Sequence, residues 1–198
     1  TGTDSGVWID HTFSQTTEIY HRFYYRTANF VYNTPGTKNF FMGDGAHYPN
    51  FWVNHYMGSR EFSVYMQVGS DTQPPCPGAD RDCIYTPNIA SVPINDGQWY
   101  CIEDHIKLNT PGQANGVVEM WVNGIQTVQY LNRTIVSTTP DCNGCSSSNS
   151  AFNYNRIFVQ HGTGLMYYDN FAVGNTRIGC SGISNTPAPS APTGLTVR

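Results

Sequence analysis

The sequence predicts an all-β protein built as one antiparallel domain. Apolar and polar residues alternate in segment after segment, and no segment repeats its apolar residues at helical spacing. Glycine and proline, which mark turns, number 19 and 12, and only 12% of the residues are charged. A chain of 198 residues can bury the core of one β-sandwich. We expect this domain to cover residues 1–183.

The strongest pattern lies between Trp99 and Val128, where two alternating stretches flank residues 109–115. Their apolar residues must face one core, and this requirement fixes the register of the two strands. The register places His105 opposite Glu119, Glu103 opposite Trp121, and Lys107 opposite Val117. Asp104 is the exception in this pattern, because it puts a carboxylate at an inward position.

The outward side of this hairpin has two interpretations. It carries Glu103, Glu119, His105, Lys107 and Trp121, and the backbones of the two glutamates are diagonal neighbours about 7–8 Å apart. On charge pattern alone, a solvated sheet face with a His–Glu pair explains these residues as well as a functional site does. A large exposed aromatic on a sheet usually stacks on a ligand, and Trp121 therefore favours the functional interpretation.

The other strands are expected at residues 7–13, 18–26, 39–42, 50–57, 62–68, 127–130, 156–161 and 166–173. In residues 18–26, Tyr20, Arg22, Tyr24 and Arg26 alternate with apolar residues and face outward. This row is either an ordinary cation–π ladder or a surface for sugars and carboxylates. His21, on the inner side, is expected to be a hydrogen-bonded core histidine. Residues 69–97 are expected to form a long loop at the rim of the binding site.

Charge and hydropathy restrict the partners. The net charge is −4 and no basic stripe is present, which argues against nucleic acid. No apolar run reaches membrane-spanning length, so we expect no membrane partner. Residues 184–193 read as a Pro/Ser/Ala linker, and residues 194–198 as the first strand of a following domain. We expect a secreted, monomeric module of a larger chain.

The six cysteines predict three disulfides, as is usual in secreted proteins. Spacing alone permits several pairings. The simplest one joins Cys76 to Cys83 across a Pro/Gly/Asp loop, Cys142 to Cys145, and Cys101 to Cys180. A redox role for the Cys142–Cys145 pair would need a helix behind it, and zinc would need a second pair of ligands. Neither feature is present in the sequence, so we interpret all six as structural.

Two motifs carry a resemblance to a known fold family. WYCIEDHIKLNTPGQANGVVEMWVNG at residues 99–124 and YYDNFAVGNTRIG at residues 167–179 resemble the concanavalin-A-like jelly rolls of the polysaccharide-lyase-like (lectin/glucanase) group. The resemblance covers roughly residues 15–178. It implies a two-sheet antiparallel jelly-roll sandwich whose concave sheet binds a glycan. The linker and residues 194–198 resemble the junction to a fibronectin-type-III module.

The resemblance also implies candidate catalytic residues. Lyases of this group use Arg, Gln or Asn to neutralise a uronate carboxylate, His or Tyr as the base, and Tyr as the acid. Residues of these types at expected outward positions are Arg22, Gln67, His105, Tyr24, Tyr65 and Tyr168. Two signatures are missing. Gln160 and His161 are adjacent where alginate-lyase relatives have Gln-X-His, and the Glu-X-Asp-X-Glu motif of laminarinase-type hydrolases is absent.

Three functions remain open on these grounds. The first is polysaccharide lyase-like β-elimination, with His105 or Tyr24 as base and Arg22 and Gln67 holding the carboxylate. The second is a non-catalytic carbohydrate-binding module. Its glycan-binding residues would be Trp121, Tyr20, Tyr24, Tyr65, Lys107 and Tyr168. The third is a glycoside hydrolase that uses Glu103 and Glu119 as its carboxylate pair. An adhesion domain that contacts protein ranks last.

No cofactor is required by any of these functions. Members of the group often carry a structural Ca²⁺, for which Asp44 and Asp169 are the candidate ligands here. Single acidic residues in turns more often cap backbone groups.

Overall fold

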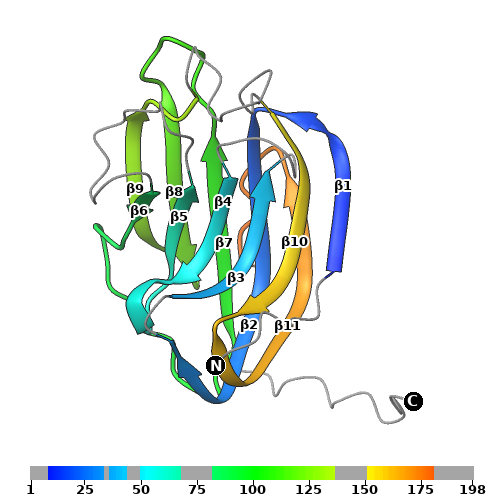
Figure 1. Ribbon diagram of the computed structural model, residues 1–198, viewed down its shortest axis with the longest axis vertical. Helices are drawn as coiled ribbons and strands as arrows, with labels where there is room; N and C mark the ends of the chain where they lie inside the picture. Colours follow the sequence, from blue (N-terminus) through cyan, green and yellow to red (C-terminus); the bar gives the residue numbers. More distant parts are fainter. Residues whose placement is uncertain (1–8, 34–35, 44–49, 68–81, 137–150, 181–198) are drawn as a thin grey trace.

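The computed structural model describes residues 9–33, 36–43, 50–67, 82–136 and 151–180, which form a two-layer β-sandwich (Figure 1). Its elements are β1 (Ile9–Thr16), β2 (Glu18–Tyr32), β3 (Thr37–Gly43), β4 (Asn50–His55), the 3₁₀ turn η1 (Tyr56–Gly58), β5 (Ser63–Gln67), β6 (Asp82–Tyr85), β7 (Tyr100–Lys107), β8 (Gly116–Val122), β9 (Ile125–Arg133), β10 (Phe152–Gln160) and β11 (Gly162–Gly174). None of these elements is a helix long and apolar enough to cross a membrane.

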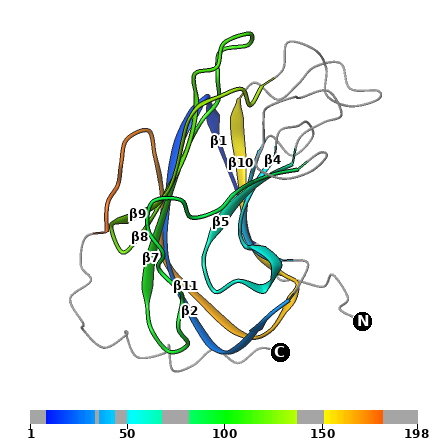
Figure 2. The same ribbon diagram turned by 90° about the vertical axis from the view of Figure 1, so that its left-hand side faces the viewer.

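The strands form two antiparallel sheets. One has six strands in the order β1-β10-β3-β4-β5-β6, and the other has five in the order β11-β2-β7-β8-β9. Figure 2 views the sandwich from the side, with β4, β5 and β10 in one layer and β2, β7, β8 and β9 in the other. The prediction of an all-β, two-sheet antiparallel sandwich is confirmed.

The core lies between the two sheets and follows the predicted alternation. The six-stranded sheet turns Phe51 and Val53 of β4 into the core, and the five-stranded sheet turns Ile102 and Ile106 of β7 into it. In β7 the outward residues from Cys101 to His105 are buried as well. Full burial of a large apolar side chain contributes about 1.5–3 kcal/mol relative to its exposure in water. This energy fixes which side of each strand remains outside and open to function.

The central hairpin has the predicted register. His105 pairs with Glu119, Glu103 with Trp121, and Lys107 with Val117. Asp104 does point inward, and its Oδ2 lies 3.0 Å from Nδ1 of His21, with both side chains fully buried. The expectation of a hydrogen-bonded core histidine at position 21 is therefore confirmed. A buried carboxylate is tolerated here because it has this partner.

Two strand assignments were wrong. Residues 69–97 are not entirely loop, because β6 (Asp82–Tyr85) pairs with β5 through Val64 and Tyr85 and forms an edge of the six-stranded sheet. This strand has four residues, too few to show an alternation in the sequence. The strand predicted at residues 18–26 continues to Tyr32, past Asn29 in the left-handed region at φ 50°.

Candidate functional site

The residues predicted to form one site lie on two different sheets. The strands β2, β7 and β8 of the five-stranded sheet carry Tyr20, Arg22, Tyr24, Glu103, His105, Lys107, Glu119 and Trp121. Tyr65 and Gln67 belong to β5 of the six-stranded sheet. The expectation that Arg22 and Gln67 hold the same uronate carboxylate is therefore wrong. Alternation shows which side of a strand faces the core, but it does not show which sheet the strand joins.

His105 is not available as a base on the outer face of the five-stranded sheet. Its Nδ1 lies 2.8 Å from Oε2 of Glu119, its Nε2 lies 3.0 Å from Oε1 of Glu18, and it is 5% exposed. The Tyr20 ring stacks on the imidazole at 4.0 Å between centroids. Both ring nitrogens are therefore occupied by carboxylates of the protein, and neither is free to face a substrate. Of the two interpretations of this face, the structural one, a His–Glu pair on the surface of a sheet, describes this cluster.

Glu119 is held as a carboxylate by its neighbours. Gln126 and Gln129 each donate a side-chain hydrogen bond to its Oε1 at 3.0 Å. Burial raises the pKa of Glu119, but the hydrogen bonds from Gln129, His105 and Gln126 outweigh it and leave the pKa below its ordinary value. A general acid needs a raised pKa, so Glu119 does not suit that role in a hydrolase.

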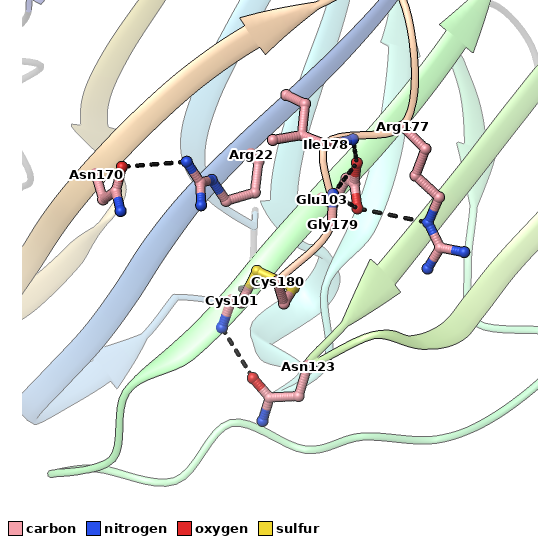
Figure 3. Close-up of a disulfide and its surroundings, with 9 residues drawn as sticks. All are labelled: Arg22, Cys101, Glu103, Asn123, Asn170, Arg177, Ile178, Gly179 and Cys180. Carbon is pink, nitrogen blue, oxygen red and sulfur yellow. Dashed lines mark hydrogen bonds and ion pairs between the residues drawn. A yellow bond between two sulfur atoms is a disulfide. The ribbon is translucent and has the colours of Figure 1, made fainter. Parts of the chain in front are cut away.

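A C-terminal strap, residues 175–180, covers Glu103 (Figure 3). The backbone N–H groups of Ile178 and Gly179 donate to its carboxylate at 2.7 and 3.2 Å, and Nε of Arg177 lies 3.6 Å away. Glu103 is fully buried as a result. A hydrolytic carboxylate must reach its substrate, so the pairing of Glu103 with Glu119 as a catalytic pair is wrong.

The same strap covers Trp121. The Arg177 guanidinium lies 4.3 Å from the centre of the indole, and Trp121 is only 7% exposed. Its expected role as an exposed sugar-stacking residue depended on an open face, which the structure does not provide. The predicted Cys101–Cys180 disulfide is present and ties the strap to β7. The other two predicted disulfides lie outside the described residues or involve side chains that are not described.

Tyr168 also differs from its expected place. Its ring faces the core, 6.0 Å from the Phe23 ring and 5.6 Å from the Tyr25 ring, and its hydroxyl donates to Oδ1 of Asn39 at 3.3 Å. Burial raises the pKa of Tyr168 far above its ordinary value. Tyr168 therefore belongs to the core and not to a glycan surface.

The outer face of the six-stranded sheet is organised differently. Directly paired residues form a line across all six strands, in the order Asp10, Arg156, Phe41, Trp52, Tyr65 and Ile84. With strands about 4.8 Å apart, this line spans about 24 Å. We call Tyr154, Phe41, Trp52 and Tyr65 the aromatic row. Phe41 lies 4.5 Å from Trp52 and 5.8 Å from Tyr154 between ring centroids.

Cations accompany the aromatic row. Nζ of Lys38 lies 4.3 Å from the centre of the Trp52 ring and 5.6 Å from that of Tyr65. Arg156 forms a bidentate pair with Asp10, with Nε and Nη2 at 2.6 and 2.9 Å from its oxygens. This pair holds the pKa of Asp10 below its usual value. Burial, with a hydrogen bond to Asp10, raises the pKa of Tyr154. Phe41 is 8% exposed and packs between its neighbours, whereas the partly exposed Tyr154, Trp52 and Tyr65 rings can stack on sugar rings beside a positive charge.

Sequence reasoning found Tyr65 in this row but missed Phe41, Trp52 and Tyr154. The stretch from Asn50 to His55 alternates between two faces that are both aromatic, so its inner face was ambiguous. The structure places Phe51, Val53 and His55 inward, which leaves Trp52 outside.

The two candidate metal ligands are not brought into a cluster that the structure describes. Asp169 is exposed on β11, and its Oδ1 accepts the backbone N–H of Asn170 at 2.7 Å, as a capping residue does. Asp44 lies outside the described residues. Within the described part of the chain, no group of three or more His, Cys, Asp or Glu side chains could hold a metal ion.

Three solved structures share this fold. An endo-β-1,4-glucuronan lyase from the fungus Trichoderma reesei matches with a TM-score of 0.57 and 17% identity, over 88% of this chain and 77% of that one. Alginate lyase vAL-1 from a Chlorella virus matches with a TM-score of 0.57 and 17% identity, over 81% of this chain and 72% of that one. Alginate lyase Aly36B matches with a TM-score of 0.53 and 18% identity, over 84% of this chain and 72% of that one. No family model and no curated protein matches the sequence. The chain has a concanavalin-A-like jelly-roll fold.

Proposed function

We propose that this chain is a secreted module that acts on an extended polysaccharide, and that the polysaccharide lies along the aromatic row. The observation that carries this proposal is the line of side chains across all six strands of one sheet. Tyr, Trp and Phe rings present flat apolar faces to the C–H faces of sugar rings. The aromatic row spans β10 to β5, three strand spacings or about 14 Å, which suits a chain of several sugars better than a single one. The Cys101–Cys180 disulfide supports secretion.

The chemistry favoured on this face is lyase-like β-elimination. Lys38 is placed over Trp52 and Tyr65, where its charge would neutralise the carboxylate of a bound uronate. The Tyr65 side chain, as its phenolate, would take the proton from the carbon next to that carboxylate. The bond to the leaving glycosidic oxygen then breaks, a carbon–carbon double bond forms, and the Tyr65 hydroxyl would pass the same proton to that oxygen, which restores the phenolate. The lyases with a similar fold support this choice.

The test is a panel of acidic and neutral polysaccharides, with ultraviolet absorbance to detect unsaturated uronates and a reducing-end assay to detect any cleavage. We expect the unsaturated product from a uronate polymer, and a loss of at least tenfold in rate in Lys38→Gln and in Trp52→Ala. Trp121→Phe on the opposite face is the matched control and should retain the wild-type rate. Wild-type cleavage that persists in both Lys38→Gln and Trp52→Ala would rule out this face.

A non-catalytic carbohydrate-binding module is the second candidate, because an aromatic row binds sugars without any proton transfer. It predicts that the protein is retained on a polysaccharide and releases neither unsaturated product nor reducing ends. Trp52→Ala should then weaken binding by about 2 kcal/mol or more, as truncation of an interface hot spot does. Retention that is unchanged in Trp52→Ala would contradict both candidates together.

A further inference from the structure

We propose that the protein has a second glycan surface, formed by Arg22, Tyr24, Arg26 and Tyr167 on the outer face of the five-stranded sheet, which binds a carboxylated polysaccharide. This surface belongs to β2 and β11, whereas the aromatic row belongs to the other sheet. The proposal therefore goes beyond the function proposed above and stands on different residues.

The surface is made of alternating cations and phenol rings. The Arg22 guanidinium lies 5.3 Å from the centre of the Tyr24 ring, and that of Arg26 lies 5.4 Å from the Tyr167 ring on the neighbouring strand. Tyr167 is 40% exposed and Leu165, two residues earlier, is 56% exposed. Four residues along a strand separate the two arginines by about 13 Å. The ladder expected from the sequence is thus present. Arg22 is 7% exposed, and the part of the ladder open to solvent consists of Tyr24, Arg26 and Tyr167.

Neither arginine of this surface forms an ion pair with an acidic side chain in the part of the chain that the structure describes. Arg22 pairs directly with Glu103 across the sheet, but the strap occupies that carboxylate, and Nη2 of Arg22 donates instead to Oδ1 of Asn170 at 3.1 Å (Figure 3). Among the described residues, Nε of Arg22 and Nε of Arg26 are buried without a hydrogen-bond partner. The guanidinium of Arg26, which is partly exposed, can donate to a carboxylate in a fork geometry, and the buried Arg22 adds positive charge behind it.

The other cations of the same face are paired. Lys107 lies 3.6 Å from Glu18 and Arg177 lies 3.6 Å from Glu103. Lys107 and Arg177 thus have acidic partners, whereas Arg22 and Arg26 have none within ion-pair distance among the residues described. The unpaired cations of this face therefore lie on β2, beside β11. Charge complementarity therefore selects an anionic ligand, and the exposed Tyr167 ring favours a sugar polymer over a peptide.

The backbone of β11 is adapted at this point. The register with β2 shifts between Asp169 and Ala172, and Asn170 has a positive φ of 47°. A bulge redirects a side chain, and bulges occur often beside functional sites. Here the bulge brings the Asn170 amide to Arg22. Asp169, which pairs with Tyr24 and is exposed, is an acidic group that opposes anion binding on this surface.

The test is affinity electrophoresis in gels that contain polygalacturonate, polyglutamate or a neutral glucan. It uses the full chain in a Trp52→Ala background, so that the aromatic row does not contribute. We expect Arg26→Gln and Tyr167→Ala each to weaken retention by polygalacturonate at least threefold, and Asp169→Asn to strengthen it. Lys107→Gln, which removes a cation already paired with Glu18, is the matched control and should change retention little.

Circular dichroism shows whether each variant is folded. Arg26→Lys keeps the positive charge at position 26 and should therefore keep most of the retention by polygalacturonate. Equal losses in Arg26→Gln and Lys107→Gln would overturn the proposal, since net charge alone would then explain retention. Equal retention by polyglutamate would overturn it as well, because the surface would not recognise sugar. Loss of catalysis or binding in Trp52→Ala tests the aromatic row separately, so failure of one proposal is distinguishable from failure of the other.

Discussion

Each outer face of the sandwich carries a tryptophan with a cation 4.3 Å from its ring centre. On the five-stranded sheet the pair is Trp121 and Arg177, and on the six-stranded sheet it is Trp52 and Lys38. Trp121 is 7% exposed, because Arg177 belongs to the strap that is bonded to Glu103 and tied down by the Cys101–Cys180 disulfide. Trp52 is partly exposed, and its cation sits on the flexible stem of a strand residue.

The difference shows that a local contact does not define a site. The indole of Trp121 is covered by Arg177 of the same chain. The disulfide and the buried Glu103 carboxylate hold the strap that carries Arg177 in place, so a sugar would have to break these interactions to reach the indole. The indole of Trp52 is partly exposed and lies between Phe41 and Tyr65 on the neighbouring strands. What separates the two tryptophans is the exposure of the indole, which the strap removes from Trp121. The predictions below test this contrast.

The largest expected effect is on the tether itself. The double substitution Cys101→Ser and Cys180→Ser removes a cross-link between residues 79 apart, without leaving a free thiol at either position. Closing a loop of this length contributes about 4 kcal/mol to the free energy of unfolding in the chain-entropy account. We expect a loss of that order in denaturant titration, together with greater quenching of Trp121 fluorescence by acrylamide.

Polysaccharide binding by the aromatic row should survive in the same double variant at a temperature where it remains folded. A loss of glycan binding equal to that in Trp52→Ala, with a native circular dichroism spectrum, would mean that the strap supports the six-stranded face as well. The contrast between the two faces would then be false.

Two histidines extend the comparison to pH. His105 lies between two carboxylates, whereas His55, on the inner side of β4, packs against the Tyr25, Tyr32 and Phe62 rings. Burial lowers the pKa of His55 to about 3, against a smaller opposing effect of the Ser59 and Glu61 backbone. The unfolded chain therefore binds a proton near pH 6.5 that the folded chain does not bind until about pH 3.

The consequence is a loss of stability on acidification. His55 does not change the free energy of unfolding above pH 6.5. Below pH 6.5 its contribution should lower that free energy by about 1.4 kcal/mol per pH unit, until the pH approaches the pKa of His55 in the folded chain. Denaturant titrations between pH 6.5 and 5 measure this slope above the range in which most carboxylates titrate. His55→Phe should flatten the slope. An unchanged slope in His55→Phe would show that another group binds the proton.

The register of the central hairpin could be predicted because two constraints agree. The alternation in β7 and β8 allows one inner face in each strand, and a shared core then leaves one register, which the structure shows. His21 and Asp104 could be placed inside by the same rule. The pairing of Cys101 with Cys180 followed once the other cysteines had been assigned to local loops.

The location of the site could not be predicted, because it depends on relations that alternation does not encode. Nothing in the sequence of β2 or β5 states which sheet the strand joins, so Arg22 and Gln67 were combined although they lie in different sheets. Trp121 does lie on the outer side of β8, as predicted. Its burial depends on Arg177, which lies far along the chain in a segment without periodicity. Tertiary contacts of this kind are visible only in the folded protein.

The smallest expected effect concerns the two cations directly. Arg177→Gln removes both the contact with Trp121, about 0.5–1 kcal/mol, and the 3.6 Å ion pair with Glu103. Arg177 is 48% exposed on its side chain and the strap's N–H groups still hold Glu103, so this pair adds about 0.2–1 kcal/mol and we expect a total loss of about 1–2 kcal/mol. Lys38→Gln should change stability no more than this, yet it should weaken polysaccharide cleavage or binding at least tenfold, whereas Arg177→Gln should leave both unchanged. The measurement is therefore a pair of denaturant titrations beside a pair of glycan assays. If Arg177→Gln and Lys38→Gln impaired the glycan assay equally, the strap would be part of the glycan surface and the two tryptophans would have the same role.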